Sequence, residues 1–147
     1  MIPSLIQIFS RDLNKLRDEI ISYKNQDSLW EIDGDISNSA GNLCLHLIGN
    51  LNWFIGEQLG DTGYVRNREK EFSVVEVDQK ELIEKIDETR ITVINVLSNL
   101  DEEDLEETFP LEVFGEPMTT GFFLVHLTTH LAYHLGQINY HRRLLDV

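Results

Sequence analysis

Histidine is the residue type in this sequence whose spacing points most directly to chemistry. Of the five histidines, His46 stands alone in the first half, whereas His126, His130, His134 and His141 lie near the C-terminus. Three of these are four residues apart. On an α-helix each such step turns the side chain by about 40° and advances it by about 6 Å, so the three rings share one face. Two imidazoles placed in this way can converge on one metal ion.

A structural explanation competes with the metal site. A single helical histidine is more often a surface or hydrogen-bonded core residue than a ligand, and a pair four apart can arise by chance. Three in register are harder to explain, because polar rings crowded inside a bundle cost free energy unless a cation compensates. A semi-polar stripe around His46 adds to the metal hypothesis, since it can face the C-terminal helix and supply a third nitrogen; its residues are Asn42, His46, Asn50, Trp53 and Glu57.

Spacing alone does not choose the pair, because His126 and His134 are equivalent neighbours of His130. Cys44, the single cysteine, lies two residues from His46 and therefore points about 200° away around a helix. It is predicted to be a small buried apolar residue rather than a ligand. A lone cysteine forms no internal disulfide, which suits a reducing cytoplasm.

Length and charge narrow the class of protein. The 147 residues fit one domain, 1–147, and the 26 acidic against 12 basic residues give a net charge of -14. Such a surface repels phosphate, which disfavours nucleic acid and anionic membranes as partners. The N-terminus does not have the pattern of a signal peptide, and no apolar run approaches the roughly 20 residues of a membrane span. A cytoplasmic protein is predicted.

Periodic apolar residues predict an all-α four-helix bundle, in up-down-up-down order. The predicted helices cover about 3–24, 37–60, 78–100 and 119–145, with Asp78 and Glu81 as a capping box and Gly60 as a C-terminal glycine.

The connections between the predicted helices differ in character. The segment 61–77 is polar and is interpreted mainly as loop, and a loop of this length in a small domain is often a lid or a binding loop. A short β-hairpin is predicted within 109–118, and one added helical turn within 101–107.

Two segments resemble the DinB-like superfamily: NSAGNLCLHLIGNLNWFIG (38–56) and HLTTHLAYHLGQINYHRRLL (126–145). The specific part is one histidine in the second helix followed by H-x-x-x-H-x-G-Q-I in the fourth. The resemblance implies a four-helix bundle, often a homodimer, with zinc or nickel held by His46, His130 and His134. It places His126 one turn before the ligands, in packing or hydrogen bonding near the site. His141 lies beyond the motif and is expected at the end of the bundle or on its surface.

Three protein ligands leave a coordination position open, as in catalytic zinc sites. That position can hold water with a pKa lowered to about 7, or a thiolate. Relatives in the superfamily include bacillithiol-dependent S-transferases and mycothiol-dependent maleylpyruvate isomerases. The resemblance therefore implies a metal-dependent thiol S-transferase, with a small thiol and an electrophile as its partners. The alternatives are a non-catalytic, stress-related metal-binding bundle, a metal-dependent hydrolase and a bundle whose histidines are structural.

No second catalytic group is evident in the sequence. The candidates for pocket residues or for contacts behind the ligands are Asn50, Trp53, Glu57, His126, Tyr133 and Gln137. Gln137, three residues after His134, is placed to hydrogen-bond near the ligands. Glu57 as a base is less favoured than a solvated carboxylate, and Arg142 and Arg143 as a clamp for a thiol's carboxylate are less favoured than surface or dimer contacts.

Overall fold

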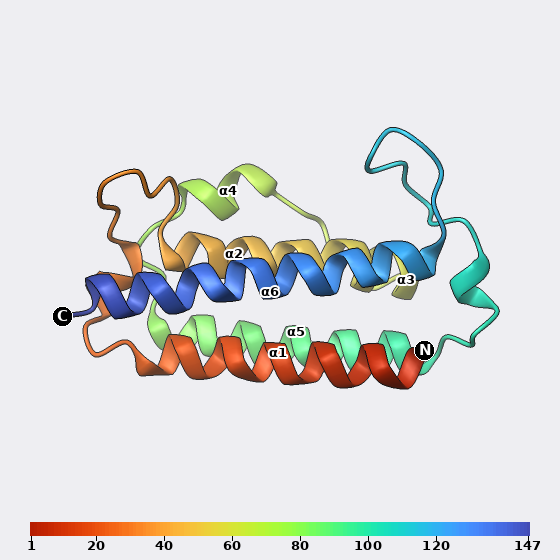
Figure 1. The fold of residues 1–147 in the computed structure, drawn as a ribbon, viewed down its shortest axis with the longest axis horizontal. Helices are drawn as coiled ribbons and strands as arrows, with labels where there is room; N and C mark the ends of the chain where they lie inside the picture. The colour runs from red at the N-terminus through yellow and green to blue at the C-terminus, as the bar shows by residue number, and fades with distance from the viewer.

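The structure, a computed structural model, describes residues 1–147 as a bundle of long helices with no β-strand (Figure 1). The all-α fold class predicted from the sequence is confirmed. The α-helices are α1 (Ile2–Ser22), α2 (Ala40–Leu51), α3 (Gln58–Gly60), α4 (Arg68–Ser73), α5 (Gln79–Ser98) and α6 (Thr120–Leu145). A π-helical turn, η2 (Asn52–Glu57), joins α2 to α3, and two 3-10 turns, η1 (Gln26–Trp30) and η3 (Asp104–Glu106), lie in the connections.

Three of the long helices begin at side-chain caps, close to the predicted starts. The Ser39 hydroxyl accepts a hydrogen bond from the Asn42 amide at 3.2 Å, Asp78 accepts from Lys80 at 2.8 Å, and Thr119 accepts from Phe122 at 3.1 Å. Each of these bonds satisfies an amide that has no partner within the helix.

The end of the α2–η2–α3 run differs from the prediction in one detail. Asp61, and not Gly60, takes the left-handed conformation that ends the run, with φ 49°. Gly60 is needed for a different reason, because a Cβ there would lie 2.4 Å from Val96.

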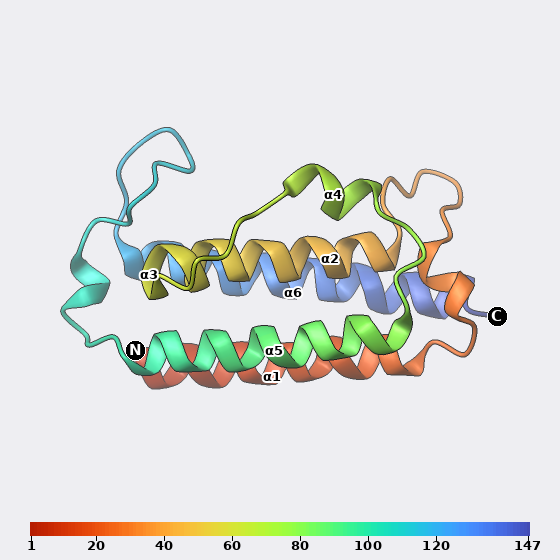
Figure 2. The same cartoon turned by 180° about the vertical axis from the view of Figure 1, so that it is seen from behind.

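The helix order is up-down-down-up, so the predicted up-down-up-down order is wrong. Helices α2 and α5 run in the same direction (Figures 1 and 2). Asn52 bonds to Thr89 at 2.9 Å, and further along Gly60 lies against Val96, so residue numbers rise together in the two helices. Two parallel neighbours need a connection that travels the length of the bundle, and the long segment after α3 is that connection.

The crossover segment, defined here as residues 61–78, passes along the outside of α2 and contains α4 (Figure 2). Its length agrees with the long loop predicted there, but the prediction does not include the helix α4. Asn67 caps α4 by accepting from the Lys70 amide at 3.2 Å. Because α4 packs on α2, the crossover segment is part of the surface around the histidines.

The predicted hairpin at 109–118 does not form. A single antiparallel bridge joins Thr108 to Thr119, with the Phe109 amide bonded to the Met118 carbonyl at 2.9 Å. The next opposed pair in this register is Pro110 with Pro117, and neither has an N–H to donate. The ladder therefore ends where the strands would have begun. One predicted turn within 101–107 is present as η3.

One hydrophobic core of 27 buried residues runs through the bundle. Phe9, Leu47, Leu97 and Phe123 are among its fully buried side chains, one from each long helix. No helix combines the length and the apolar character needed to cross a membrane.

Candidate metal centre

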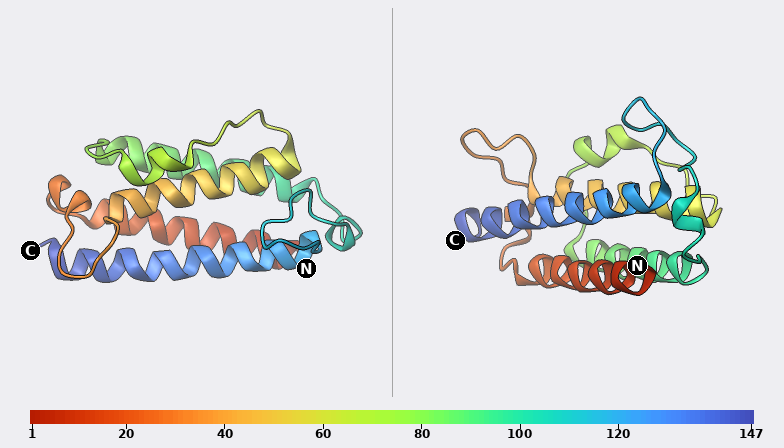
Figure 3. Two further views of the ribbon diagram at one scale, coloured as in Figure 1. Left: turned by 90° about the horizontal axis from the view of Figure 1, so that it is seen from above. Right: turned by 45° about the vertical axis from the view of Figure 1, so that its right-hand side comes forward.

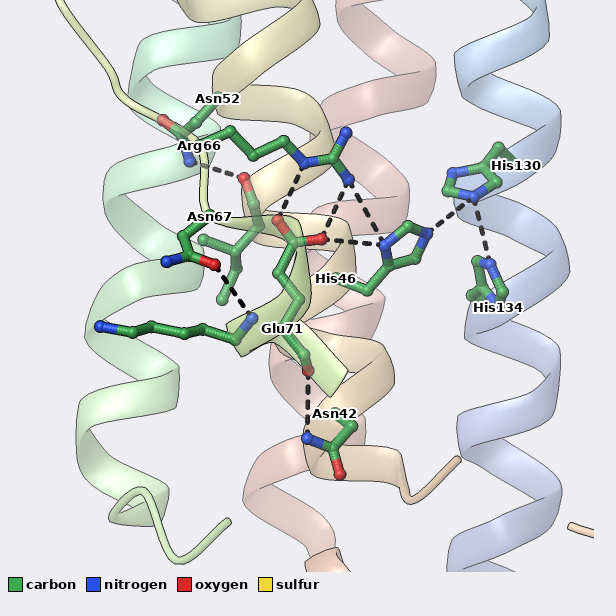
Figure 4. Close-up of polar contacts among 10 residues, drawn as sticks. Asn42, His46, Asn52, Arg66, Asn67, Glu71, His130 and His134 are labelled. Atoms are coloured by element: carbon green, nitrogen blue, oxygen red, sulfur yellow. Dashed lines mark hydrogen bonds and ion pairs between the residues drawn. The ribbon is translucent and has the colours of Figure 1, made fainter. Parts of the chain in front are cut away.

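His46 from α2 and His130 and His134 from α6 point toward one another (Figure 4). The Nε2 atom of His130 lies 3.2 Å from Nε2 of His46 and 3.1 Å from Nε2 of His134. The candidate ligand atoms of the three residues all lie within 4.8 Å of one another. His46 is buried and the other two are half-buried, so the cluster lies at the edge of the core.

The two short Nε2–Nε2 separations fit a common metal ion. Zinc bound at about 2.05 Å separates two nitrogen ligands by about 3.3 Å in tetrahedral geometry and by about 2.9 Å at a right angle. The contacts of 3.1 and 3.2 Å lie between these values. The donor set is therefore compatible with zinc and with nickel, both of which imidazole suits.

Hydrogen bonding among the rings does not account for the cluster. Nε2 of His130 has either one proton or one lone pair, so it satisfies at most one of its two nitrogen neighbours. Its other ring nitrogen, Nδ1, is buried and has no hydrogen-bond partner. A shared cation would take the Nε2 lone pairs of all three rings and so remove their conflict. The residues present thus fit a three-histidine metal site.

Behind His46 lies a carboxylate from the crossover segment. Glu71 accepts from Nδ1 of His46 at 3.0 Å, and Arg66 holds the same carboxylate with two hydrogen bonds of 2.9 Å (Figure 4). Burial by itself raises the pKa of Glu71, but the hydrogen bonds from His46 and Arg66 and the charge of Arg66 lower it below its usual value. An ionised Glu71 fixes the proton of His46 on Nδ1 and leaves Nε2 free to bind a metal.

Two residues of α2 position Glu71. The Asn42 side chain donates to the Glu71 carbonyl at 3.0 Å and to the Val74 carbonyl at 2.6 Å, which fastens the end of α4 to α2. Gly49 makes room for the carboxylate, because a Cβ at this position would lie 1.9 Å from Oε2 of Glu71. Gly49, three residues after His46, is therefore part of the site.

On the other side of the cluster, Nδ1 of His134 donates to Oε1 of Gln137 at 2.7 Å. The predicted role of Gln137 near the ligands agrees with this contact. Burial lowers the pKa of His134, and the Gln137 hydrogen bond partly offsets that effect. Burial, together with the charges that His134 and His46 carry when protonated, lowers the pKa of His130 to about 3. Neutral imidazole is the form that binds metal.

The remaining candidates are spread around this centre. Asn50 is buried one turn after His46, and its side-chain oxygen has no hydrogen-bond partner. Trp53 is half-buried in η2 and bonds to none of the three histidines. Glu57 accepts from the Gly63 amide, so it anchors the start of the crossover segment and does not face the histidines. His126 packs against Phe rings instead, with its centroid 6.3 Å from that of His130.

His141 lies at the end of the bundle, one of its two expected places, and it is buried there and not on the surface. Its Nε2 lies 2.8 Å from the Glu31 carbonyl, and since a carbonyl only accepts, Nε2 carries the proton. Nδ1 therefore accepts from the Tyr23 hydroxyl at 2.7 Å. Cys44 is also fully buried, as predicted, and burial raises the pKa of its thiol to about 12.

A cleft of about 630 Å³ begins at His134 and follows α6 toward its C-terminal end. Its volume is in the range of small-molecule sites. One wall is α6, and the other is the segment 35–38 ahead of α2, which lies beside the C-terminal half of α6 (Figure 3). Tyr133 lines this cleft with its ring 5.2 Å from that of His134, so its predicted place in a pocket agrees with the structure.

Sequence reasoning missed Arg66 and Glu71, the two charged residues whose side chains lie within hydrogen-bond distance of His46. Both lie in the segment interpreted as loop, 20 and 25 residues after His46. The signal available was Asn67, a favoured N-cap residue, followed by the acidic Glu69 in the first turn, which is typical of a helix start. Recognising α4 would have placed a carboxylate-bearing helix in the long connection.

Comparisons with known proteins agree with this architecture. The model of a family described as "Protein of unknown function (DUF1572)" matches residues 3–146. None of the curated proteins compared with the chain is significantly similar to it.

Two solved structures have the same fold. A DinB-like protein from Bacillus cereus ATCC 10987 superposes with a TM-score of 0.76 at 17% sequence identity, over 95% of this chain and 89% of that one. A conserved protein from Enterococcus faecalis superposes with a TM-score of 0.77 at 16% identity, over 97% and 95%. The DinB-like resemblance predicted from the two histidine motifs is thereby confirmed for the fold.

Proposed function

The chain belongs to the DUF1572 family of proteins of unknown function, and we propose that it is a divalent-metal-dependent enzyme with a DinB-like fold. His46, His130 and His134 would hold the metal through Nε2. The convergence of these three nitrogens, with contacts of 3.1 and 3.2 Å, is the observation that carries the proposal. The metal we propose is zinc or nickel, the ions that the DinB-like resemblance implies and that imidazole ligands suit.

The reaction we propose is the transfer of a small thiol to an electrophile. Three protein ligands leave a coordination position open, and a bound divalent ion supplies the positive charge that keeps a thiol ionised near neutral pH. In the transfer, the sulfur forms a bond to the electrophilic carbon, the leaving group departs with the electrons of its bond, and the thiol proton passes to solvent.

The chain's own residues prepare this chemistry by fixing the histidines. Glu71 and Gln137 each accept from an Nδ1 proton, so the rings of His46 and His134 are held with Nε2 toward the common point. Such contacts behind metal ligands commonly change metal affinity by about 10- to 100-fold when removed. The low pKa of His130 keeps this ring neutral and ready to bind.

Metal analysis tests the binding step. Protein purified without an affinity tag is expected to contain about one zinc or nickel ion per chain. His130→Ala should lose that ion, while His126→Ala, one turn away on the same helix, should keep it. A stoichiometric ion in His130→Ala, or none in the unaltered protein after reconstitution and dialysis, would refute the site.

Turnover tests the reaction. Metal-loaded protein is supplied with small thiols and a panel of electrophiles, and the disappearance of thiol is compared with the release of leaving group. Thiol-dependent release supports transfer. Release without thiol would refute transfer and indicate a hydrolase, and metal binding with no turnover on the panel would support the non-catalytic alternative.

A further inference from the structure

The residues that line the cleft beside His134 determine which molecules can bind there. The cleft spans three turns of α6, from Tyr133 to Leu144, which is about 16 Å along the helix axis. That length and the volume of about 630 Å³ suit a small organic molecule larger than a single aromatic ring. Molecules of this size can differ in charge, and the charged residues around the cleft decide which of them bind.

The walls of the cleft are largely apolar and unusually exposed. Tyr133, Tyr140 and Leu144 project from α6 with 65, 64 and 63% of their surface exposed, and all three line the cleft. Leu43 and Ile36 line the opposite side. Exposed apolar side chains gathered around a concavity are typical of a binding site. An amphipathic organic molecule can cover them.

The charges around the cleft are of one sign. Asp35 is the one carboxylate among its lining residues, and no lysine or arginine is among them. The neighbouring stretch EIDGDISNS, from Glu31 to Ser39, adds two more carboxylates and no base. An anion entering here meets repulsion and finds no cation to pair with.

The two arginines nearest in sequence are already engaged. Arg142 donates to Glu19 at 2.7 Å, and Arg143 lies over the Tyr140 ring at 5.3 Å, outside the lining. The carboxylate clamp considered for these residues is therefore not formed at the cleft. A thiol that carries several carboxylates fits this lining poorly.

We propose that the cleft binds the organic part of the molecule that reaches the metal, and that it selects an uncharged or cationic amphipathic molecule over an anionic one. The inference rests on the proposed function for the metal and adds the class of substrate. The apolar contacts come from Tyr133, Tyr140 and Leu144, and the selection by charge comes chiefly from Asp35.

The test uses three probes of one size: benzylamine, benzyl alcohol and benzoate, which are cationic, neutral and anionic and contain no thiol. Binding is followed by NMR shifts of the tyrosine ring resonances, with metal-free and with zinc-loaded protein. Because an exposed charge interaction contributes up to roughly 1 kcal/mol, the attraction of benzylamine and the repulsion of benzoate together should make benzylamine bind about 5-fold tighter than benzoate. Benzyl alcohol should fall between them.

Two variants test whether Asp35 is the source of the charge preference. Asp35→Asn should bring the affinities of benzylamine and benzoate to within about 2-fold of each other, while the matched exposed control Asp101→Asn should leave their ratio unchanged. Equal or tighter binding of benzoate to the unaltered protein would overturn the inference. So would a charge preference that Asp35→Asn retains.

The same experiment separates failure of this inference from failure of the metal proposal. A charge preference in metal-free protein that shows no zinc binding would support the cleft and refute the metal site. Zinc binding without any shift of the Tyr133 or Tyr140 resonances on addition of the probes would support the metal site and refute the cleft inference. Concentration-dependent dimers that bury both tyrosines, with no probe bound, would also overturn the inference.

Discussion

Gly49 offers the sharpest test of how the site is built, through the single change Gly49→Ala. A Cβ added at this position would lie 1.9 Å from Oε2 and 2.6 Å from Cδ of Glu71. To reach an ordinary contact of 3.4 Å, the carboxylate has to retreat by about 1.5 Å. That movement takes it out of hydrogen-bond range of His46, of Arg66 or of both.

The magnitude follows from what Glu71 does. Loss of a carboxylate behind a metal-bound histidine lowers metal affinity by about 10- to 100-fold, which is about 1.4–2.7 kcal/mol. For the metal-free protein two effects oppose each other. Alanine favours the helix by about 1 kcal/mol over glycine, whereas disruption of the buried Arg66–Glu71 pair costs about 3 kcal/mol. The net loss of stability is therefore expected to be about 2 kcal/mol.

Zinc affinity is measured by competition with a chromophoric chelator, and stability by urea unfolding of chelated protein. Gly136→Ala is the matched control, because it is also a glycine within a helix and a Cβ there would meet nothing within 4 Å. It should leave zinc affinity unchanged and raise stability by up to about 1 kcal/mol. Thermal unfolding with and without zinc gives an independent measure, since the stabilisation by bound metal increases with the logarithm of its affinity.

Zinc affinity of Gly49→Ala within about 2-fold of the unaltered protein would refute the reasoning about Glu71. If Gly49→Ala does not fold, Glu71→Gln takes its place, because it keeps the shape of the side chain and removes its charge. This second variant should also lose at least about 10-fold in zinc affinity.

Three further predictions concern stability and reactivity. Chelated protein should lose stability as the pH falls below about 6.5, the ordinary pKa of histidine, because His130 has a pKa of about 3 in the folded protein and stays unprotonated where the unfolded chain binds a proton. The urea midpoints at pH 7 and pH 5 should therefore differ less in His130→Gln than in the unaltered protein. An equal difference would contradict this. Tyr23→Phe should lower the free energy of unfolding in urea by about 1–2 kcal/mol, since Nδ1 of buried His141 then lacks its donor; an unchanged midpoint would argue against the bond. Cys44 should resist iodoacetamide in native protein and react fully in urea, because burial raises its thiol pKa to about 12; rapid native alkylation would contradict its burial.

The parts of this protein that were predictable from sequence are those set by local rules. The caps at Ser39, Asp78 and Thr119 and the helical spacing of His130 and His134 depend on residues three or four apart. Periodicity therefore placed the long helices and the face that carries two of the ligands.

The topology and the surroundings of His46 depend on contacts that no local pattern records. A connection of the length of 61–78 is compatible with either helix order, and only the packing of α2 on α5 decides between them. Glu71 reaches His46 across 25 residues from a six-residue helix whose polar sequence also suits a loop. The hairpin predicted from the alternation in 109–118 does not form, because the opposed prolines 110 and 117 have no N–H with which to continue the ladder.

Because Glu71 belongs to the crossover segment and not to the four long helices, metal affinity and the docking of that segment are thermodynamically linked. The free energy by which the Glu71 carboxylate strengthens metal binding equals the free energy by which a bound ion strengthens the attachment of α4 to α2. Proteolytic cleavage or amide exchange within 61–78 should therefore slow when the ion is present. The crossover segment, which lies outside the four long helices, would then report on whether the metal site is occupied.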